Sequence, residues 1–227
     1  MQSSALKNQT YILQNLISRG QNSLFFKNIQ KNITNYSSFK RFIPITDYES
    51  IRPYIQKISN GENGVLTQGK PKYFAITSGT TSGKKYIPLT KKMMSFQTQA
   101  IKELLLLYAY QVNKYVISNI GMMFIQGSPE LKYYNKMPYA KLSGISARHV
   151  PFFLKKNRYP SMKTNYISNW EKKIKHIVKE THNKDMRIIG GIPPWVITYF
   201  NELLNYTGAK TAKEVFPNLE LYIHGGT

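Results

Sequence analysis

Short β-rich runs alternate with longer helical runs from residue 73 to the end of the chain, and this alternation limits the fold more than any other feature. Strands that are separated by helices favour an α/β fold with at least partly parallel strands. The first forty residues instead show helical spacing of apolar side chains. We therefore expect a helical N-terminal segment followed by a mixed sheet with packed helices. The predicted strands are Tyr73–Thr77, "KYIP" from Lys85, "GMMFIQG" from Gly121, "MRIIGG" from Met186 and "LELYIHGG" from Leu219.

Capping signals predict three helix starts, the last of them at Thr211 with Glu214. Thr46 with Glu49, and Ser168 with Glu171, have the spacing of a capping box, in which the two side chains satisfy backbone N–H groups at the helix start. Pro53 has no backbone N–H to donate, so we expect a turn after Thr46 and the helix proper from just before this proline.

A long helix is predicted from Thr90 to about Asn113. A stripe of apolar side chains at helical spacing is typical of packing against a core, so no cofactor site is expected there. The later range Tyr133–Pro160 is aromatic, basic and interrupted by prolines, which predicts loops and a pocket wall. The stripe on the long helix consists of Met94, Ile101, Leu104, Leu105 and Tyr108.

The chain is strongly basic, with a net charge of +21 from 32 lysines and arginines against 11 aspartates and glutamates. Such a charge suits an acidic partner such as nucleic acid. Most of the cations are lysines scattered along the chain, however, and the few arginines form no stripe with aromatic residues. Because arginine is the usual reader of phosphates and base edges, the composition argues against a nucleic-acid partner.

The sequence also suggests a compartment. There is no cysteine, which excludes a disulfide framework and a thiolate metal site. The first residues lack the basic and apolar regions of a signal peptide. The apolar run "LLLLYAY" from Leu104 is far shorter than the ~20 residues that a membrane span needs. We therefore expect a cytoplasmic protein with no membrane partner.

The loop between the first two predicted strands is the segment that most clearly suggests chemistry. Residues 78–85 are "SGTTSGKK". Glycines let backbone N–H groups approach an anion, hydroxyls add donors and lysines add charge, so the loop suits a phosphate chain. It is not a P-loop, because only three residues separate Gly79 from Gly83 and a second lysine follows Lys84. A plain polar hairpin turn is the alternative interpretation.

The loop resembles the phosphate-binding motif of adenylate-forming enzymes, and in the form "SGTTSGKKYIP" it is similar to that of the GH3 family of acyl acid–amido synthetases. The resemblance extends to "FKRFIPITDYESIRPYIQKISNGE" before the loop and to "GGIPPWVITYFNELLNYTG" and "VFPNLELYIHGGT" after it. It covers nearly the whole chain and is closer to bacterial members than to plant ones. It implies that the fold is the N-terminal portion of the large domain of an adenylate-forming enzyme.

The resemblance implies an ATP-dependent ligase. In this family a carboxylic acid reacts with ATP to give an acyl adenylate, and the amine of an amino acid then attacks the adenylate to form an amide. The implied partners are a small-molecule carboxylic acid and an amino acid, the implied cofactors are ATP and Mg²⁺, and no residue is assigned to catalysis. The residues implied to hold the ATP phosphates are Thr77, Ser78, Gly79, Thr80, Thr81, Ser82, Gly83, Lys84 and Lys85.

Two further residues are candidates for the substrate pocket. His224 follows a predicted strand, and α/β proteins often bind ligands at the carboxyl ends of strands. Trp195 follows the proline that opens a predicted helix, where packing in the core is its alternative role. The four histidines show no metal-ligand spacing, so no protein metal site is expected. Which of Lys84 and Lys85 faces the phosphates stays open.

Members of the family are more than twice as long as this chain. Two of their later nucleotide motifs, a Glu-Gly block and an Arg-x-Gly-Asp block, do not occur in the sequence. We therefore expect residues 1–227 to be a partial N-terminal domain, truncated before the C-terminal part and the C-terminal domain, and inactive alone. A catalytically silent fragment, an acyl-CoA synthetase-like adenylating enzyme and a basic nucleic-acid-binding module stay as alternatives.

Overall fold

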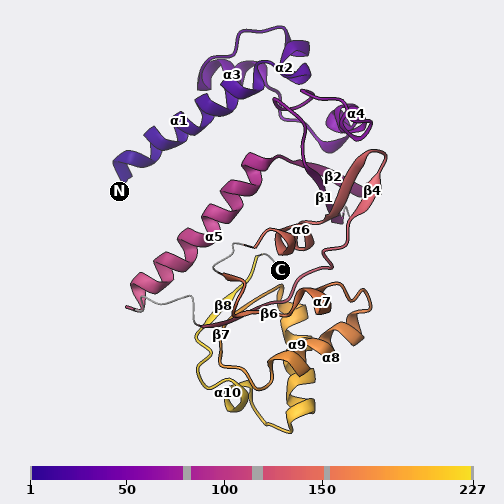
Figure 1. Ribbon diagram of the computed structural model, residues 1–227. Coiled ribbons are helices and arrows are strands. Elements are labelled where there is room, and N and C mark those ends of the chain that lie inside the picture. Colours follow the sequence, from indigo (N-terminus) through magenta and orange to yellow (C-terminus); the bar gives the residue numbers. More distant parts are fainter. Residues whose placement is uncertain (1, 79–82, 114–119, 151–153, 226–227) are drawn as a thin grey trace. The chain divides into compact units, whose positions relative to one another are not determined.

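The computed structural model describes residues 2–78, 83–113, 120–150 and 154–225. These residues form two compact units, one of Met1–Lys91 with Lys132–Tyr139 and one of Lys92–Leu131 with Ala140–Thr227 (Figure 1). The predicted order of elements, helices first and then strands alternating with helices, is confirmed. No helix in the described part of the chain combines the length and the apolar character that crossing a membrane requires.

The first unit begins with the helices α1 (Gln2–Gly20), α2 (Leu24–Ile29), α3 (Tyr36–Phe42) and α4 (Tyr48–Ser59). Side chains at the starts of the last three accept hydrogen bonds from backbone N–H groups of the first turn, which satisfies donors that a helix start leaves free. These capping residues are Ser23, Asn35 and Asp47.

The predicted start of α4 is wrong in two respects. The capping residue is Asp47 instead of Thr46, and its carboxylate accepts hydrogen bonds from the backbone N–H and the hydroxyl of Ser50 at 2.8 and 2.6 Å. These bonds hold the pKa of Asp47 below its ordinary value. Pro53 lies inside the helix and does not delay its start. Burial of Ile55 and Ile58 in the core of the unit explains why the helix continues past the proline.

The sheet of the first unit has the strand order β2-β1-β5-β4. Strands β1 (Tyr73–Ser78) and β2 (Lys84–Leu89) pair antiparallel, as do β4 (Lys132–Tyr134) and β5 (Met137–Lys141). Apolar side chains of this sheet and of α4 form one core with Val65; its fully buried members are Ile55, Ile58, Val65, Phe74 and Met137.

The expectation of loops over Tyr133–Pro160 is therefore wrong in large part. The range holds β5, most of β4, helix α6 (Leu142–Arg148) and the short strand β6 (Arg158–Tyr159). Its prolines had argued against regular structure, but Pro138 pairs with Tyr133 inside a strand. Asn135 makes the tight turn between the strands, in the left-handed conformation that asparagine tolerates. Residues 151–153, which include Pro151, lie outside the described residues.

The sheet of the second unit has the strand order β6-β3-β7-β8, and every neighbouring pair is parallel. Its strands besides β6 are β3 (Gly121–Phe124), β7 (Met186–Gly190) and β8 (Leu221–Ile223). The helices of this unit besides α6 are α5 (Lys91–Gln111), α7 (Met162–Asn165), α8 (Trp170–Thr181), α9 (Pro193–Thr207) and α10 (Ala212–Val215). The predicted parallel strands are confirmed.

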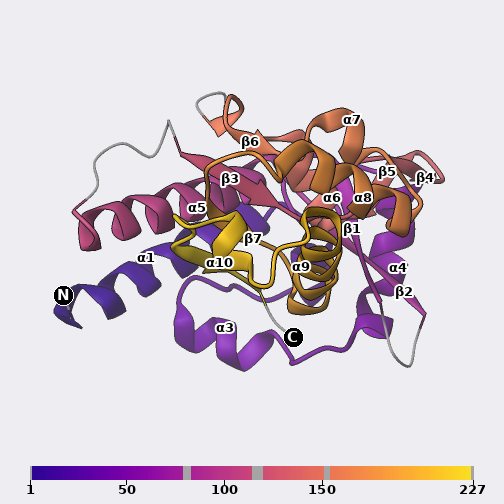
Figure 2. The same cartoon turned by 90° about the horizontal axis from the view of Figure 1, so that it is seen from below.

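Helices cover both faces of this parallel sheet. On one face, Met123 and Ile189 pack in a core with α8 and α9. On the other face, Met122 and Ile188 pack with Leu105 of α5. Neighbouring strand residues thus enter opposite cores, as the pleat of a strand requires. Figures 1 and 2 both show α5 on the side of the sheet away from α8 and α9.

Helix α8 starts one residue later than its predicted capping box implies. Asn169, not Ser168, caps it and accepts a hydrogen bond from the N–H of Lys172 at 2.8 Å. Its inward face with Ile174, Ile177 and Val178 is confirmed.

The close approach of β3 and β7 gives a test of the fold. A Cβ at Gly121 would lie 2.3 Å from the backbone oxygen of Asp185, so a side chain there forces the two strands apart. We expect Gly121→Ala to lower the free energy of unfolding by about 1–3 kcal/mol in urea titrations. Gly225→Ala is the matched control, because a Cβ at Gly225 meets open space. Equal midpoints for the two variants would contradict this packing.

Candidate functional site

The predicted phosphate loop connects the two strands of an antiparallel hairpin. Thr77 pairs with Lys85 and Ser78 with Lys84. Gly83 has a φ of +73°, in the left-handed region, and a Cβ on it would meet nothing within 4 Å. The predicted residues Gly79, Thr80, Thr81 and Ser82 lie outside the described residues. Both predicted flanking strands are confirmed, and the exposed flank at Gly83 leaves room for an anion.

The two lysines of the hairpin have different surroundings. Successive side chains of a strand point to opposite faces of a sheet, so Lys84 and Lys85 leave β2 in opposite directions. The Nζ of Lys85 lies 5.7 Å from the ring centre of Tyr48 in α4, and its charge helps to lower the pKa of Asp47. Lys84 is exposed. The structure therefore separates a lysine that contacts α4 from one that faces solvent.

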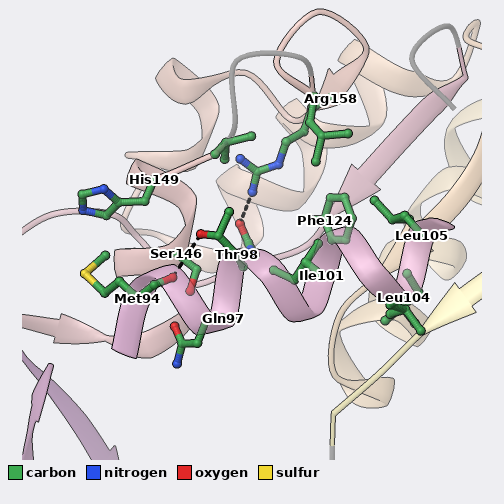
Figure 3. Close-up of a pocket in the computed structure, with 14 residues that line it drawn as sticks. Met94, Gln97, Thr98, Ile101, Leu104, Leu105, Phe124, Ser146, His149 and Arg158 are labelled. Carbon is green, nitrogen blue, oxygen red and sulfur yellow. Dashed lines mark hydrogen bonds between the residues drawn. The ribbon is translucent and has the colours of Figure 1, made fainter. Parts of the chain in front are cut away.

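A cavity of about 210 Å³ lies in the second unit, between α5, the sheet and α6 (Figure 3). Helix α5 contributes Met94, Ile101 and Leu104 to its wall, and Leu105 closes it from the core. The prediction that this stripe packs in a core thus holds for Leu105, which is 3% exposed, whereas Ile101 and Leu104 are each 44% exposed. Helix α5 therefore contributes both a buried side chain and half-exposed side chains to the same wall.

Arg158 brings a positive charge into this largely apolar cavity. Its guanidinium lies over the ring of Phe124, 5.4 Å from the ring centre, and donates a hydrogen bond to the side-chain oxygen of Gln126. Burial lowers the pKa of Arg158 to about 10, so the group stays charged at neutral pH. No carboxylate among the described residues forms an ion pair with it. The cation therefore has no acidic partner in the described part of the chain.

A buried lysine lies behind Gln126. Lys173 of α8 is 2% exposed, and its Nζ donates hydrogen bonds to the backbone oxygens of Gln126 at 2.8 Å and Asn165 at 3.1 Å. Burial lowers the pKa of Lys173 to about 8. Gln126 is thus held by its backbone through Lys173 and by its side chain through Arg158. The predicted pocket wall over Tyr133–Pro160 includes Arg158, but no role was predicted for any of the three residues individually. Lys173 lies between Trp170 and Ile174 on the inward face of α8, where a charge is unusual.

The two predicted pocket residues lie elsewhere in the second unit. Trp195 packs against the core, with its ring 4.8 Å from that of Trp170 and the Nζ of Lys141 5.6 Å from its centre. His224 is exposed, and its ring stacks on Tyr222 at 5.3 Å. Neither lines the cavity, although Ile223, the neighbour of His224, does. The hairpin residues do not line it either; they belong to the first unit.

Acidic and histidine side chains offer no protein metal site in the described ranges. There, no three histidine, aspartate or glutamate residues come together closely enough to hold an ion.

Comparison with known proteins shows which family has this sequence and architecture. The family model "GH3 family N-terminal domain" matches residues 1–167. Jasmonoyl-L-amino acid synthetase JAR4 of Nicotiana attenuata is 31% identical over 102 residues, which is 44% of this chain and 17% of that protein. The probable indole-3-acetic acid-amido synthetase GH3.11 of Oryza sativa subsp. japonica is 28% identical over 174 residues, 73% of this chain and 28% of that protein.

A solved structure shares the fold. The AtGH3.15 acyl acid amido synthetase in complex with 2,4-DB superposes with a TM-score of 0.69 and 16% identity, over 89% of this chain and 36% of that one. The fold is therefore that of the N-terminal portion of an acyl acid amido synthetase. The chain belongs to the GH3 family. It spans about a third or less of the length of these relatives. The relatives named here do not support the expected closeness to bacterial members, since those with a stated organism are plant proteins.

The buried amine of Lys173 gives a prediction on stability. Its pKa is about 8 in the folded protein against 10.5 as the ordinary value, so between these pH values the unfolded chain binds more protons and stability rises with pH. We expect the free energy of unfolding of the wild type, relative to Lys173→Met, to increase by about 1.5 kcal/mol from pH 8 to 9.5. Urea titrations across that range measure it.

Lys175→Met is the control, because Lys175 is exposed on the same helix. The difference in free energy of unfolding between the wild type and Lys175→Met should not grow from pH 8 to 9.5. If the difference between the wild type and Lys173→Met is also independent of pH, the amine of Lys173 is not held out of water.

Proposed function

We propose that the protein is an ATP-dependent acyl acid–amido synthetase that joins a small carboxylic acid to an amino acid. In the first step the carboxylate oxygen attacks the α-phosphorus of ATP, and pyrophosphate leaves. In the second step the amine attacks the acyl carbonyl, loses a proton and displaces AMP. The observation that carries the proposal is the match of the GH3 N-terminal domain over residues 1–167. Because relatives are much longer, we propose that this chain supplies the N-terminal part of the enzyme.

The hairpin loop is the proposed site for the β- and γ-phosphates. The first step brings an anionic carboxylate to a polyanionic nucleotide, so positive charge and N–H or O–H donors must offset the repulsion. The loop supplies Thr77, Ser78, Thr80, Thr81 and Ser82 as hydroxyl donors, with Gly79 and Gly83 to admit backbone N–H groups. Lys84 is the proposed phosphate contact of the two lysines, because Lys85 is engaged with Tyr48.

The cavity of the second unit is the proposed site for the organic part of the acid. Its walls from α5 and the sheet are mainly apolar, which suits a hydrocarbon or aromatic body. The relative solved with 2,4-DB supports binding of a small molecule by this fold. Trp195 and His224 do not line the cavity, so any contribution of these two candidates to substrate binding would have to come from another surface.

Mg²⁺ fits this scheme as an ion that arrives with the nucleotide. It is commonly bound through substrate phosphates, waters and one or two carboxylates, and the described residues offer no cluster of protein ligands for it. When bound, it would neutralise phosphate charge. We also propose a cytoplasmic location, supported by the cysteine-free sequence, which suits a reducing compartment.

Two other functions lead to different results in the same assays. An acyl-CoA-forming relative would perform the first step and then transfer the acyl group to a thiol instead of an amine. A basic nucleic-acid-binding module would show binding that weakens steeply with salt and no adenylation.

The first test removes hydroxyl donors of the loop. We expect the triple variant Ser78→Ala, Thr80→Ala and Thr81→Ala to lose at least about a hundredfold in ATP–pyrophosphate exchange, since a hydrogen bond to a charged group contributes about 1.5–3 kcal/mol. The assay uses the protein at its natural length with a panel of carboxylic acids. Undiminished exchange in a folded variant would remove the loop from the mechanism.

The second test separates the two lysines. Lys84→Met should lower ATP–pyrophosphate exchange by about tenfold or more, because it removes a cation from the phosphate site. Lys85→Met should lose less activity and instead lower the free energy of unfolding by about 0.5–1 kcal/mol, through loss of its contact with Tyr48. The reverse ranking of the two variants in the exchange assay would assign the phosphate contact to Lys85.

A further inference from the structure

The cavity contains a feature that the family match does not assign, namely a half-buried cation in a largely apolar wall. Figure 3 shows the guanidinium of Arg158 reaching toward α5, with Phe124, Leu104 and Leu105 on one side and Ser146 and His149 on the other. A charge is seldom left without an acidic partner in such surroundings, because removal from water disfavours it. A ligand carboxylate that enters the cavity would supply this partner.

We propose that Arg158 is the residue that binds the carboxylate of the acid substrate, and that Gln126 positions it for this contact. The proposal rests on the proposed function, in which the cavity accepts the acid. Among the described residues, Arg158 donates through one Nη to Gln126, so other N–H groups of its five-donor fork can serve a carboxylate. An Arg–carboxylate contact is charge-assisted and directional, so it can both hold the acid and orient its oxygen atoms.

The geometry explains why glutamine at position 126 positions the guanidinium of Arg158 better than an acidic residue would. Its side-chain oxygen is neutral, so it fixes the guanidinium without cancelling the charge. Its backbone is fixed in turn by the Nζ of Lys173 at 2.8 Å. The cation is thus held in place by a neutral acceptor whose own position is set from the core. A glutamate here would pair with Arg158 and compete with the substrate.

The size of the cavity suggests suitable probes. An apolar cavity of roughly 150 Å³ holds a benzene ring, and this cavity of about 210 Å³ has room for a ring with a short acidic arm. Phenylacetate is an acid of this kind. Phenylacetamide has nearly the same shape but no charge, so the ratio of the two dissociation constants isolates the contribution of the carboxylate.

The experiment measures both dissociation constants by isothermal titration calorimetry at neutral pH, on the protein at its natural length. We expect the wild type to bind phenylacetate about tenfold or more tightly than phenylacetamide. Arg158→Gln should bring the ratio close to one while the affinity for phenylacetamide is kept. Gln126→Glu should also bring the ratio close to one, because the new carboxylate neutralises the guanidinium.

Arg148→Gln is the matched control. Arg148 donates to the backbone oxygen of Pro129 and the hydroxyl of Tyr166 and does not line the cavity, so its replacement should leave the ratio unchanged. A wild-type ratio near one, or a ratio that survives both Arg158→Gln and Gln126→Glu, would overturn the proposal. An equal loss of both ligands in a folded Arg158→Gln variant would also overturn it, since the residue would then only shape the wall. If Arg158→Gln does not fold, Gln126→Glu decides.

The binding experiment on Arg158 and the exchange assay on the proposed ligase can succeed or fail independently. Selective carboxylate binding through Arg158 without any ATP–pyrophosphate exchange would sustain the inference and count against the ligase. Exchange that persists while Arg158→Gln keeps its selectivity would sustain the ligase and refute the role of Arg158.

Discussion

The parallel pairing of β3 with β7 is the constraint on which the second unit depends. These two central strands have apolar residues on both faces, so each face must be covered by helices to remove it from water. Met123 and Ile189 require α8 and α9 on one side, and Met122 and Ile188 require α5 on the other. The placement of α5 follows from this need, and the cavity lies between α5, the sheet and α6.

The polar residues near the cavity are linked by hydrogen bonds that lead from the core to the cavity wall. Lys173 is almost fully buried, where an amine is tolerated because two backbone oxygens accept its hydrogen bonds. One of these oxygens belongs to Gln126, whose side chain accepts from Arg158. The depressed pKa of Lys173 and that of Arg158 have the same cause, which is burial. Two cations are therefore present where composition alone suggests only surface charge.

Much of the architecture could be predicted because local patterns and tertiary packing agree there. The strands at Tyr73 and Met186 combine β-branched or aromatic residues with clear flanking turns, and the inward face of α8 shows plain helical spacing. Predictions failed where packing outweighed a local signal. Pro53 suggested a later helix start, but burial of Ile55 and Ile58 keeps it inside α4. Asn135 supplied a tight turn that the prolines around it obscured.

The candidate site was only partly accessible to sequence reasoning. The hairpin loop could be proposed as a phosphate site from the sequence, because such a site depends on a contiguous run of small and hydroxyl residues, and this assignment stays a prediction. Arg158 and Gln126 line the cavity, and Lys173 binds the backbone of Gln126; these three residues are separated in sequence and meet only in the folded unit. Trp195 and His224 were chosen for their local positions, and such positions do not show which side chains share a wall.

The exposed part of α5 has a consequence for how such a protein can diversify. Ile101 and Leu104 line the cavity without being buried in either core, so exchanging them alters the shape offered to a guest molecule while folding is little disturbed. Leu105, one residue further, is buried against the sheet and has no such freedom. A single helix thus carries, at adjacent positions, half-exposed side chains that shape the cavity and a buried side chain on which the core depends.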